Sequence, residues 1–242
     1  MKAIGIIPAR YASTRFPGKP LADIRGKSMI RRVYEQSKAC KELQKVVVAT
    51  DDQRILDHVK DFGGEAMMTR SDHASGTERC GEVIPKLKGD YEYVVNIQGD
   101  EPFLDPGQIS LLLRCFDNPA TGIATLVKET ENQDEIRNPD IVKVIPSADL
   151  TALCFSRLPI PYVRDPEKEK GVVFYKHIGL YGFRRKVLEK LLNLPPAPPE
   201  QAESLEQLRW LYHGYKIQLA LSDQESHSVD TPGDLSKILN TP

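Results

Sequence analysis

Three cations follow an apolar run near the start of the sequence. After AIGII, which begins at Ala3, the chain carries Arg10, Arg15 and Lys19 among alanine, serine and glycine residues. Small residues let a ligand approach the backbone, an arginine fork binds two oxygens at once, and a lysine supplies a point charge. Each cation alone is an ordinary surface residue, but together they predict a binding site for a triphosphate. The segment has neither the GxxxxGKS/T nor the GxGxxG pattern, so it is neither a P-loop nor a dinucleotide-binding motif.

Two carboxylates are candidates for holding a metal beside the phosphates. Asp100 follows an apolar run in the sequence NIQGDEP, and Asp230 follows Ser228-Val229 and precedes the start of a helix. Mg²⁺ in such sites takes one or two carboxylates together with phosphate oxygens and waters. Each aspartate also has a simpler interpretation as a turn-forming acid. Taken together with the three cations, the pair predicts a Mg²⁺ site.

The first half of the sequence alternates strands and helices, and this order would position the candidate side chains. Its apolar runs are continuous, which is typical of strands covered on both faces, as in parallel sheets. Ser28 is a good N-cap, and Gly63-Gly64 ends the second helical pattern. The order predicts a doubly wound α/β sheet. The expected strands span residues 3–7, 46–49, 65–68, 93–97 and 123–127, and the expected helices span 28–40, 53–62 and 106–116, with another starting late in 70–83.

The polar residues that follow these strands should meet on one side of the sheet. In open α/β sheets the ligand lies outside the carboxyl ends of the strands. We therefore expect Arg10, Asp51, residues 75–79 and Asp100 to face one crevice.

The pattern changes from about Glu129 onwards. Residues of about 129–200 are predicted to form an inserted, partly antiparallel region within a single domain that spans residues 1–242. The end of the sequence reads Thr231-Pro232-Gly233-Asp234, which predicts an N-cap and a short closing helix. The remaining expectations are strands at 142–145, 152–156, 177–183 and 217–221, a helix at 202–212, a solvated charged loop at 164–171 and a stiff linker at 195–199.

Composition excludes several classes of protein. The 33 lysines and arginines nearly balance the 34 aspartates and glutamates, for a net charge of −1, which argues against a general nucleic-acid or membrane-surface binder. The four cysteines, Cys40, Cys80, Cys115 and Cys154, show no metal-ligand pattern and are predicted to be reduced core thiols. No apolar run approaches the ~20 residues of a membrane helix, and the N-terminal run is too short for a signal peptide. We expect a soluble, cytoplasmic protein.

Short motifs spread in order over almost the whole chain resemble those of one enzyme family. They are IIPARYASTRFPGKPL, VVVATDD, GGEAMMTRSDHASGTER, VVNIQGDEP, CFSRLPIPY, KHIGLYGFR, ESLEQLR and SVDTPGDL. The ordered set resembles the 3-deoxy-manno-octulosonate (Kdo) cytidylyltransferases, or CMP-Kdo synthetases. The opening motif alone would also admit the CMP-sialate synthetases, whereas the segments around His177 and Arg209 favour the octulosonate enzymes.

The resemblance implies transfer of CMP from CTP to the anomeric hydroxyl of Kdo, with release of pyrophosphate, for bacterial lipopolysaccharide synthesis. It also implies a Rossmann-like nucleotidyltransferase fold with a mainly parallel mixed sheet, a homodimer contact in the inserted region, Mg²⁺ as cofactor, and CTP and Kdo as substrates. Neither a nucleic acid nor a membrane is expected as a partner.

The resemblance also implies roles for individual residues. Arg10, Lys19, Asp100 and Asp230 would be catalytic, and both aspartates would bind Mg²⁺. The residues expected to bind CTP are Pro8, Ala9, Arg10, Arg15, Lys19, Ser75 and Gly76. The residues expected to bind the sugar acid are Arg79, Gln98, Arg157, His177, Tyr181, Glu206 and Gln207, with Arg157 or Arg79 suited to its carboxylate.

Periodicity alone supports plainer interpretations of some of these residues. Glu206 and Gln207 would be solvated helix residues, and His177 a structural histidine. Two other classes of protein are alternatives to a cytidylyltransferase. A non-catalytic nucleotide sensor would be free to lose a metal carboxylate, and a glycosyltransferase would normally carry a DxD motif, which QGDEP is not. The chain retains both aspartates, which favours a catalyst.

Overall fold

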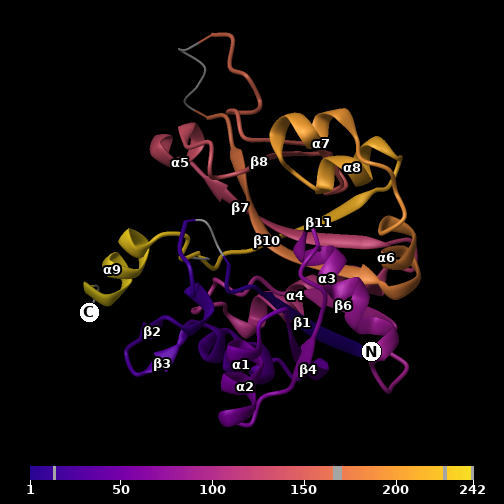
Figure 1. The fold of residues 1–242 in the computed structure, drawn as a ribbon. Helices are drawn as coiled ribbons and strands as arrows, with labels where there is room; N and C mark the ends of the chain where they lie inside the picture. The colour runs from indigo at the N-terminus through magenta and orange to yellow at the C-terminus, as the bar shows by residue number, and fades with distance from the viewer. Residues whose placement is uncertain (13–14, 166–170, 226–227, 241–242) are drawn as a thin grey trace. The chain divides into compact units, whose positions relative to one another are not determined.

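The computed structural model describes residues 1–12, 15–165, 171–225 and 228–240. The chain divides into two compact units (Figure 1). The first comprises Met1–Ser110 and Ser226–Pro242, and the second Leu111–Glu225. The second unit is therefore inserted between two pieces of the first along the chain. The expectation of one domain with an insertion at about 129–200 stays a prediction, and the observed boundaries of the second unit are wider.

The first unit is built on four parallel strands in the order β6-β1-β4-β5, with a separate β2–β3 hairpin. The predicted α/β alternation is confirmed here. The strands are β1 (Ala3–Ala9), β2 (Asp23–Ile24), β3 (Lys27–Ser28), β4 (Leu43–Thr50), β5 (Ala66–Met68) and β6 (Tyr93–Asn96). The helices are α1 (Met29–Ala39), α2 (Gln53–Asp61), α3 (Gly76–Val83) and α9 (Pro232–Asn240), and α4 (Pro106–Arg114) runs across the boundary between the units.

Helices α1 and α3 cover opposite faces of β1 (Figure 1). A Cβ on Gly99 would lie 3.6 Å from Ile7 of β1 and 3.9 Å from Ile30 of α1, whereas a Cβ on Gly76, at the start of α3, would lie 3.0 Å from the Pro8 ring. Successive side chains of a strand point to opposite faces, so the neighbours Ile7 and Pro8 identify the two sides. Burial on both faces explains why β1 is a continuous apolar run.

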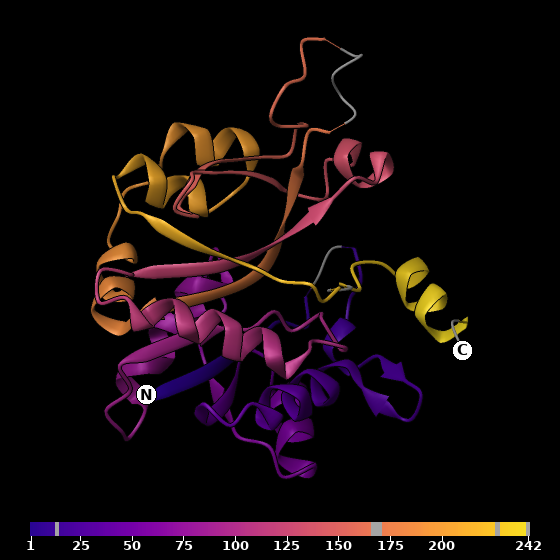
Figure 2. The same ribbon diagram turned by 180° about the vertical axis from the view of Figure 1, so that it is seen from behind.

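The predicted helix ends of the first unit are confirmed. The Ser28 hydroxyl accepts from the Arg31 amide at 3.3 Å. Gly63 has a φ of 79°, and the Gly64 amide donates to the Val59 carbonyl at 2.8 Å, which closes α2 in a Schellman motif. The C-terminal helix α9, drawn in yellow and seen from behind in Figure 2, starts at the predicted cap.

The second unit is a mixed sheet. Strand β7 pairs with β11 in parallel and with β10 antiparallel, and β10–β8–β9 continue antiparallel. The predicted antiparallel character of this region is confirmed. The strands are β7 (Ile123–Thr130), β8 (Lys143–Pro146), β9 (Ala152–Ser156), β10 (Phe174–Arg184) and β11 (Ile217–Leu221), and the helices are α5 (Gln133–Arg137), α6 (Arg185–Leu191), α7 (Pro198–Glu203) and α8 (Gln207–Tyr212).

The expected single helix at 202–212 is wrong. The structure has α7 and α8, separated at Ser204, whose φ of 52° is left-handed. The reason is tertiary, because the Arg157 guanidinium donates to the Glu203 carbonyl at 2.8 Å at this break. The linker expected at 195–199 is also only partly right, since Pro198 opens α7, a position where proline fits well.

Some smaller expectations have mixed outcomes. All four cysteines are free thiols, but Cys154 is exposed, so the expectation of core thiols is wrong there. Among the helices that the structure describes, none has the length and hydropathy needed to cross a membrane. Most of the charged loop expected at 164–171 lies outside the described residues.

Candidate active site

A cavity of about 270 Å³ opens in the first unit at the carboxyl ends of β1 and β6 and the start of α3. Its lining brings together every residue predicted to bind CTP or metal, along with Arg79 and Gln98. The lining residues are Pro8, Ala9, Arg10, Arg15, Lys19, Pro20, His73, Ala74, Ser75, Gly76, Arg79, Gln98, Gly99, Asp100 and Asp230. The predicted crevice is therefore confirmed for Arg10, Ser75, Gly76, Arg79 and Asp100, whereas Asp51, Thr77 and Glu78 are not among the lining residues. The individual roles of the site residues stay predictions.

Asp100 and Asp230 converge on one ammonium group. Lys19 Nζ donates to Asp100 Oδ2 at 2.8 Å and to Asp230 Oδ1 at 3.3 Å. Arg15 Nη2 also donates to Asp230 Oδ1, at 3.0 Å. The lysine side chain is only 14% exposed, so its charge is held largely within the cavity wall.

Contacts far apart in the sequence bring the two aspartates together. The Val229 amide donates to the Asp100 carbonyl at 2.9 Å. The Val229 side chain is fully buried and packs in a small core with Ile24 and Met29. Packing of Val229 in this core therefore places its neighbour Asp230 at the edge of the cavity.

The two carboxylates fit a magnesium ion. They lie close enough together to share one cationic partner, Lys19, and carboxylate oxygens are the ligands that Mg²⁺ prefers. The described residues contain no group of three or more histidine, cysteine, aspartate or glutamate side chains that could hold a metal. Mg²⁺ does not require one, because substrate oxygens and waters complete its shell.

The cationic loop is folded around Tyr11. The Gly18 amide donates to the Tyr11 carbonyl at 2.9 Å, and Gly18 has a φ of 74°. A Cβ at this position would lie 3.1 Å from the Tyr11 ring, so both space and conformation require glycine. The Arg54 guanidinium covers the ring at 3.3 Å from its centroid. Arg10 is exposed and has no hydrogen bond or ion pair within the described chain, so its guanidinium is available to a ligand.

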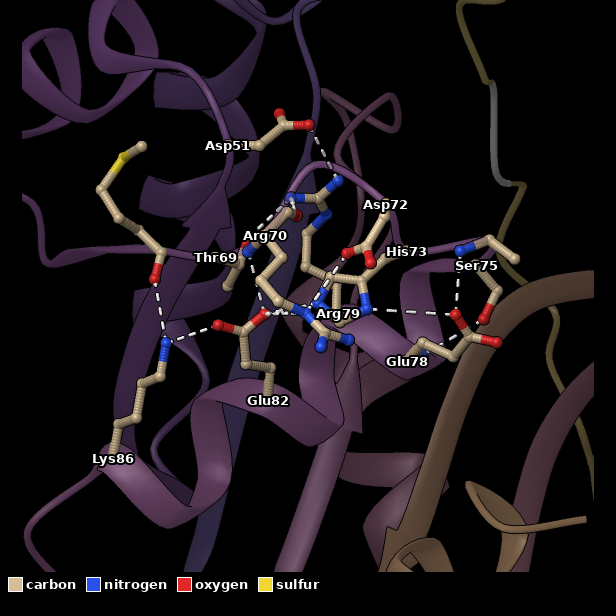
Figure 3. Close-up of polar contacts among 12 residues, drawn as sticks. Asp51, Thr69, Arg70, Asp72, His73, Ser75, Glu78, Arg79, Glu82 and Lys86 are labelled. Atoms are coloured by element: carbon tan, nitrogen blue, oxygen red, sulfur yellow. Dashed lines mark hydrogen bonds and ion pairs between the residues drawn. The ribbon is translucent and has the colours of Figure 1, made fainter.

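Arg79 and His73, two residues of the cavity lining, belong to a polar network (Figure 3). Arg79 is 4% exposed and donates to Thr69 Oγ1 at 2.6 Å and to Asp51 Oδ2 at 3.2 Å. Its guanidinium is thus engaged with the protein, and its predicted contact with the sugar acid stays a prediction. His73 was not predicted; its Nε2 pairs with Glu82 Oε2 at 2.5 Å.

The other five predicted sugar-binding residues belong to the second unit. They come from the end of β9, from β10 and from the start of α8: Arg157, His177, Tyr181, Glu206 and Gln207. Arg157 donates through its side chain to the Glu203 carbonyl at 2.8 Å and to the Pro139 carbonyl at 2.9 Å.

His177 and Tyr181 form an aromatic pair within this unit. Their ring centroids are 5.2 Å apart. Burial lowers the pKa of His177 to about 3. Burial, together with the charge of Glu206, raises the pKa of Tyr181 well above its ordinary value. The buried Tyr181 hydroxyl has no hydrogen-bond partner among the residues that the structure describes, so it is available to a ligand.

Comparisons with known proteins agree with this geometry. A family model described as cytidylyltransferase matches residues 4–217. This chain belongs to the cytidylyltransferase family. The predicted resemblance is therefore confirmed at the level of the family.

Individual relatives narrow the position of this cytidylyltransferase within its family. The chain is 52% identical to the 3-deoxy-manno-octulosonate cytidylyltransferase of Parabacteroides distasonis, over 99% of this chain and 97% of that protein. It is 45% identical, with a TM-score of 0.92, to a solved CMP:2-keto-3-deoxy-manno-octonic acid synthetase complexed with CTP, over 99% of this chain and 97% of the other. The predicted assignment to the octulosonate enzymes is confirmed, and the sialate alternative is not favoured.

A distant structure agrees on the fold alone. The 4-diphosphocytidyl-2C-methyl-D-erythritol synthase of Anaerococcus prevotii has a TM-score of 0.65 at 12% identity, over 98% of this chain and 97% of the other. The predicted Rossmann-like nucleotidyltransferase fold is therefore confirmed for this cytidylyltransferase.

Proposed function

We propose that this chain transfers CMP from CTP to Kdo and releases pyrophosphate, for lipopolysaccharide synthesis. The observation that carries the proposal is the cavity in which three cations and two convergent carboxylates meet. Its setting is a chain similar over nearly its whole length to a synthetase solved with CTP.

In the proposed reaction the anomeric hydroxyl oxygen of Kdo attacks the α-phosphorus of CTP. The bond from that phosphorus to the bridging oxygen of the β-phosphate breaks, pyrophosphate leaves with the electron pair, and the hydroxyl proton passes to solvent. Such a transfer needs positioning and charge stabilisation rather than covalent catalysis by the protein. Arg10, Arg15 and Lys19 would supply the positive charge for the phosphates. Pro8, Ala9, Ser75 and Gly76 would lie beside the nucleoside.

We infer that Asp100 and Asp230 hold Mg²⁺. When bound there, the ion would neutralise phosphate charge and lower the pKa of the attacking hydroxyl. Lys19 has three donors, so its ammonium can bond phosphate oxygens as well as the carboxylates that it now contacts. The lysine would thereby fix the position of the CTP phosphates relative to the two aspartates.

For the acceptor, the second unit supplies groups of suitable chemistry. The unpaired Tyr181 hydroxyl and the amide of Gln207 suit sugar hydroxyls. His177 would act as a neutral hydrogen-bonding group, since burial holds its pKa at about 3.

We also propose that the protein is a cytoplasmic homodimer. Leu153 and Leu158 are exposed apolar side chains of the second unit that support an interface there.

The test is to incubate the purified protein with CTP, Kdo and Mg²⁺ and to follow pyrophosphate and CMP-Kdo. Turnover with Kdo that stops on chelation of Mg²⁺ is expected. Release of pyrophosphate with sialic acid but not with Kdo would refute the assignment of the acceptor.

The metal assignment is tested with Asp100→Asn, which keeps the size of the side chain. Loss of one charge-stabilising group typically costs on the order of 10²–10³-fold in turnover, and we expect at least that loss. Asp90→Asn is the matched control, because Asp90 is exposed and pairs only with Lys2 at 3.7 Å among the described residues. Near-full activity of Asp100→Asn would remove Asp100 from the metal site.

A further inference from the structure

One wall of the cavity is a segment with no regular secondary structure. Residues 69–75 connect β5 to α3 and contribute His73, Ala74 and Ser75 to the lining. Such a wall is rigid only if contacts outside the segment hold it. Figure 3 shows that these contacts come mainly from α3.

The Glu82 carboxylate makes two of these contacts and a third to Lys86. Its Oε2 accepts from the Arg70 amide at 2.9 Å and pairs with His73 Nε2 at 2.5 Å. Its Oε1 accepts from Lys86 Nζ at 2.5 Å, and the same ammonium reaches the Met68 carbonyl at 3.4 Å. Glu82 therefore fixes the segment both at its start and at its centre.

Charge and burial make this arrangement strong. The Glu82 side chain is 17% exposed, and the His73 side chain 5%. Burial alone would raise the pKa of Glu82, but the hydrogen bonds from Lys86, Arg70 and His73 outweigh it and lower the pKa to about 2. The carboxylate is thus ionised, and hydrogen bonds to an ionised acceptor are stronger than neutral ones.

Glu78 and Arg79 also hold the segment, mainly at its ends. Glu78 accepts from the Ala74 amide at 2.8 Å, beside the Ser75 cap of α3. Arg79 holds Thr69 and the Arg70 carbonyl. The His73 imidazole, a cavity-lining group, makes its short contact with Glu82, whereas Glu78 Oε2 lies 3.9 Å from its Nδ1.

We propose that Glu82 is a positioning residue of the nucleotide site. It lies outside the cavity lining and acts through His73 and the backbone at Arg70, so that the wall is ordered before the nucleoside of CTP arrives. Preorganisation improves affinity by removing the cost of ordering on binding. The inference rests on the proposed function, because it names CTP as the ligand of this wall.

The test is calorimetric titration of CTP, with Mg²⁺ and without acceptor, into the wild type and Glu82→Gln. The amide keeps the size of the side chain but loses the charge and one acceptor, so the dissociation constant for CTP should rise about tenfold. The turnover number at saturating CTP should stay within about threefold, and the KM for Kdo should not change.

The matched control is Glu35→Gln on α1. Glu35 also accepts from two cations, Lys27 at 2.6 Å and Arg31 at 2.8 Å, but neither partner lines the cavity. This variant should bind CTP as the wild type does. Equal weakening by both variants, or a dissociation constant for folded Glu82→Gln within twofold of the wild type, would overturn the proposal.

A second variant keeps the test decisive if Glu82→Gln folds poorly. His73→Gln should weaken CTP binding to a similar extent, and the double variant should weaken it no further than the stronger single change. Additive losses would show that Glu82 does not act through His73. If the wild-type protein binds CTP but releases no pyrophosphate with Kdo, the proposed function is refuted. The role of Glu82 is still tested in that case, because it is read from the dissociation constants for CTP.

Discussion

Lowering the pH from 7 to 5 should destabilise the second unit through His177. Burial lowers the pKa of this imidazole from its ordinary 6.5 to about 3. Between these two values the unfolded chain binds a proton that the folded chain does not. Stability is therefore lost as the pH falls below about 6.5, and the loss is complete near pH 3.

The contacts of the His177 imidazole explain why the folded protein does not bind this proton. His177 Nε2 lies 2.9 Å from Thr125 Oγ1, and that hydroxyl donates its single proton to a carbonyl such as that of Leu180, at 2.8 Å. The imidazole therefore donates through Nε2 and stays unprotonated at Nδ1. The Phe155 ring, at 5.3 Å, and the Tyr181 ring enclose it without offering a carboxylate.

The magnitude at pH 5 follows from the same values. The interval from 6.5 to 5 corresponds to a loss of about 2 kcal/mol at most, and because His177 is only half-buried the expected loss is about 1–2 kcal/mol. Urea unfolding of the wild type and His177→Gln at pH 7 and pH 5 measures it. The variant should lose that much less stability between the two pH values.

The matched control for this experiment is His213→Gln. His213 bonds the Pro195 carbonyl at 3.0 Å through an exposed contact. This variant should keep the acid sensitivity of the wild type. Equal losses of stability between pH 7 and pH 5 for the wild type and His177→Gln would refute the reasoning.

Two further changes test other parts of the structure. Gly18→Ala should lower the free energy of unfolding in urea by about 1–2 kcal/mol, because φ is 74° at this position. It should also raise the KM for CTP by displacing Lys19. An unchanged KM would show that the turn does not position the lysine. Lys143→Met should lower the free energy of unfolding by about 2 kcal/mol, because the fully buried ammonium donates to the carbonyls of Asn138, Ile141 and Arg157. Removal of a buried charge offsets part of this loss. A variant as stable as the wild type would mean that these carbonyls find other partners.

The donor side of the site was predictable because its signals are local. Arg10, Arg15 and Lys19 follow a buried strand within a short stretch, and Asp100 follows another. In a parallel sheet the ends of such strands share one edge. Those residues meet at the cavity as expected.

The parts that sequence reasoning missed depend on tertiary contacts. His73 and Glu82 stand nine positions apart, across the boundary between a loop and a helix, so no periodicity links them. The break at Ser204 depends on Arg157, which is distant in sequence.

The hydrogen bond from the Val229 amide to the Asp100 carbonyl joins two parts of the donor site that are synthesised at different times. All cations of the donor site and the first carboxylate are translated early, but the second carboxylate follows the whole of the second unit. A nascent chain that has emerged only as far as Glu225 therefore carries the phosphate cations without Asp230. The donor site is completed only after the ribosome has passed the second unit, so nascent chains should not acquire activity before then.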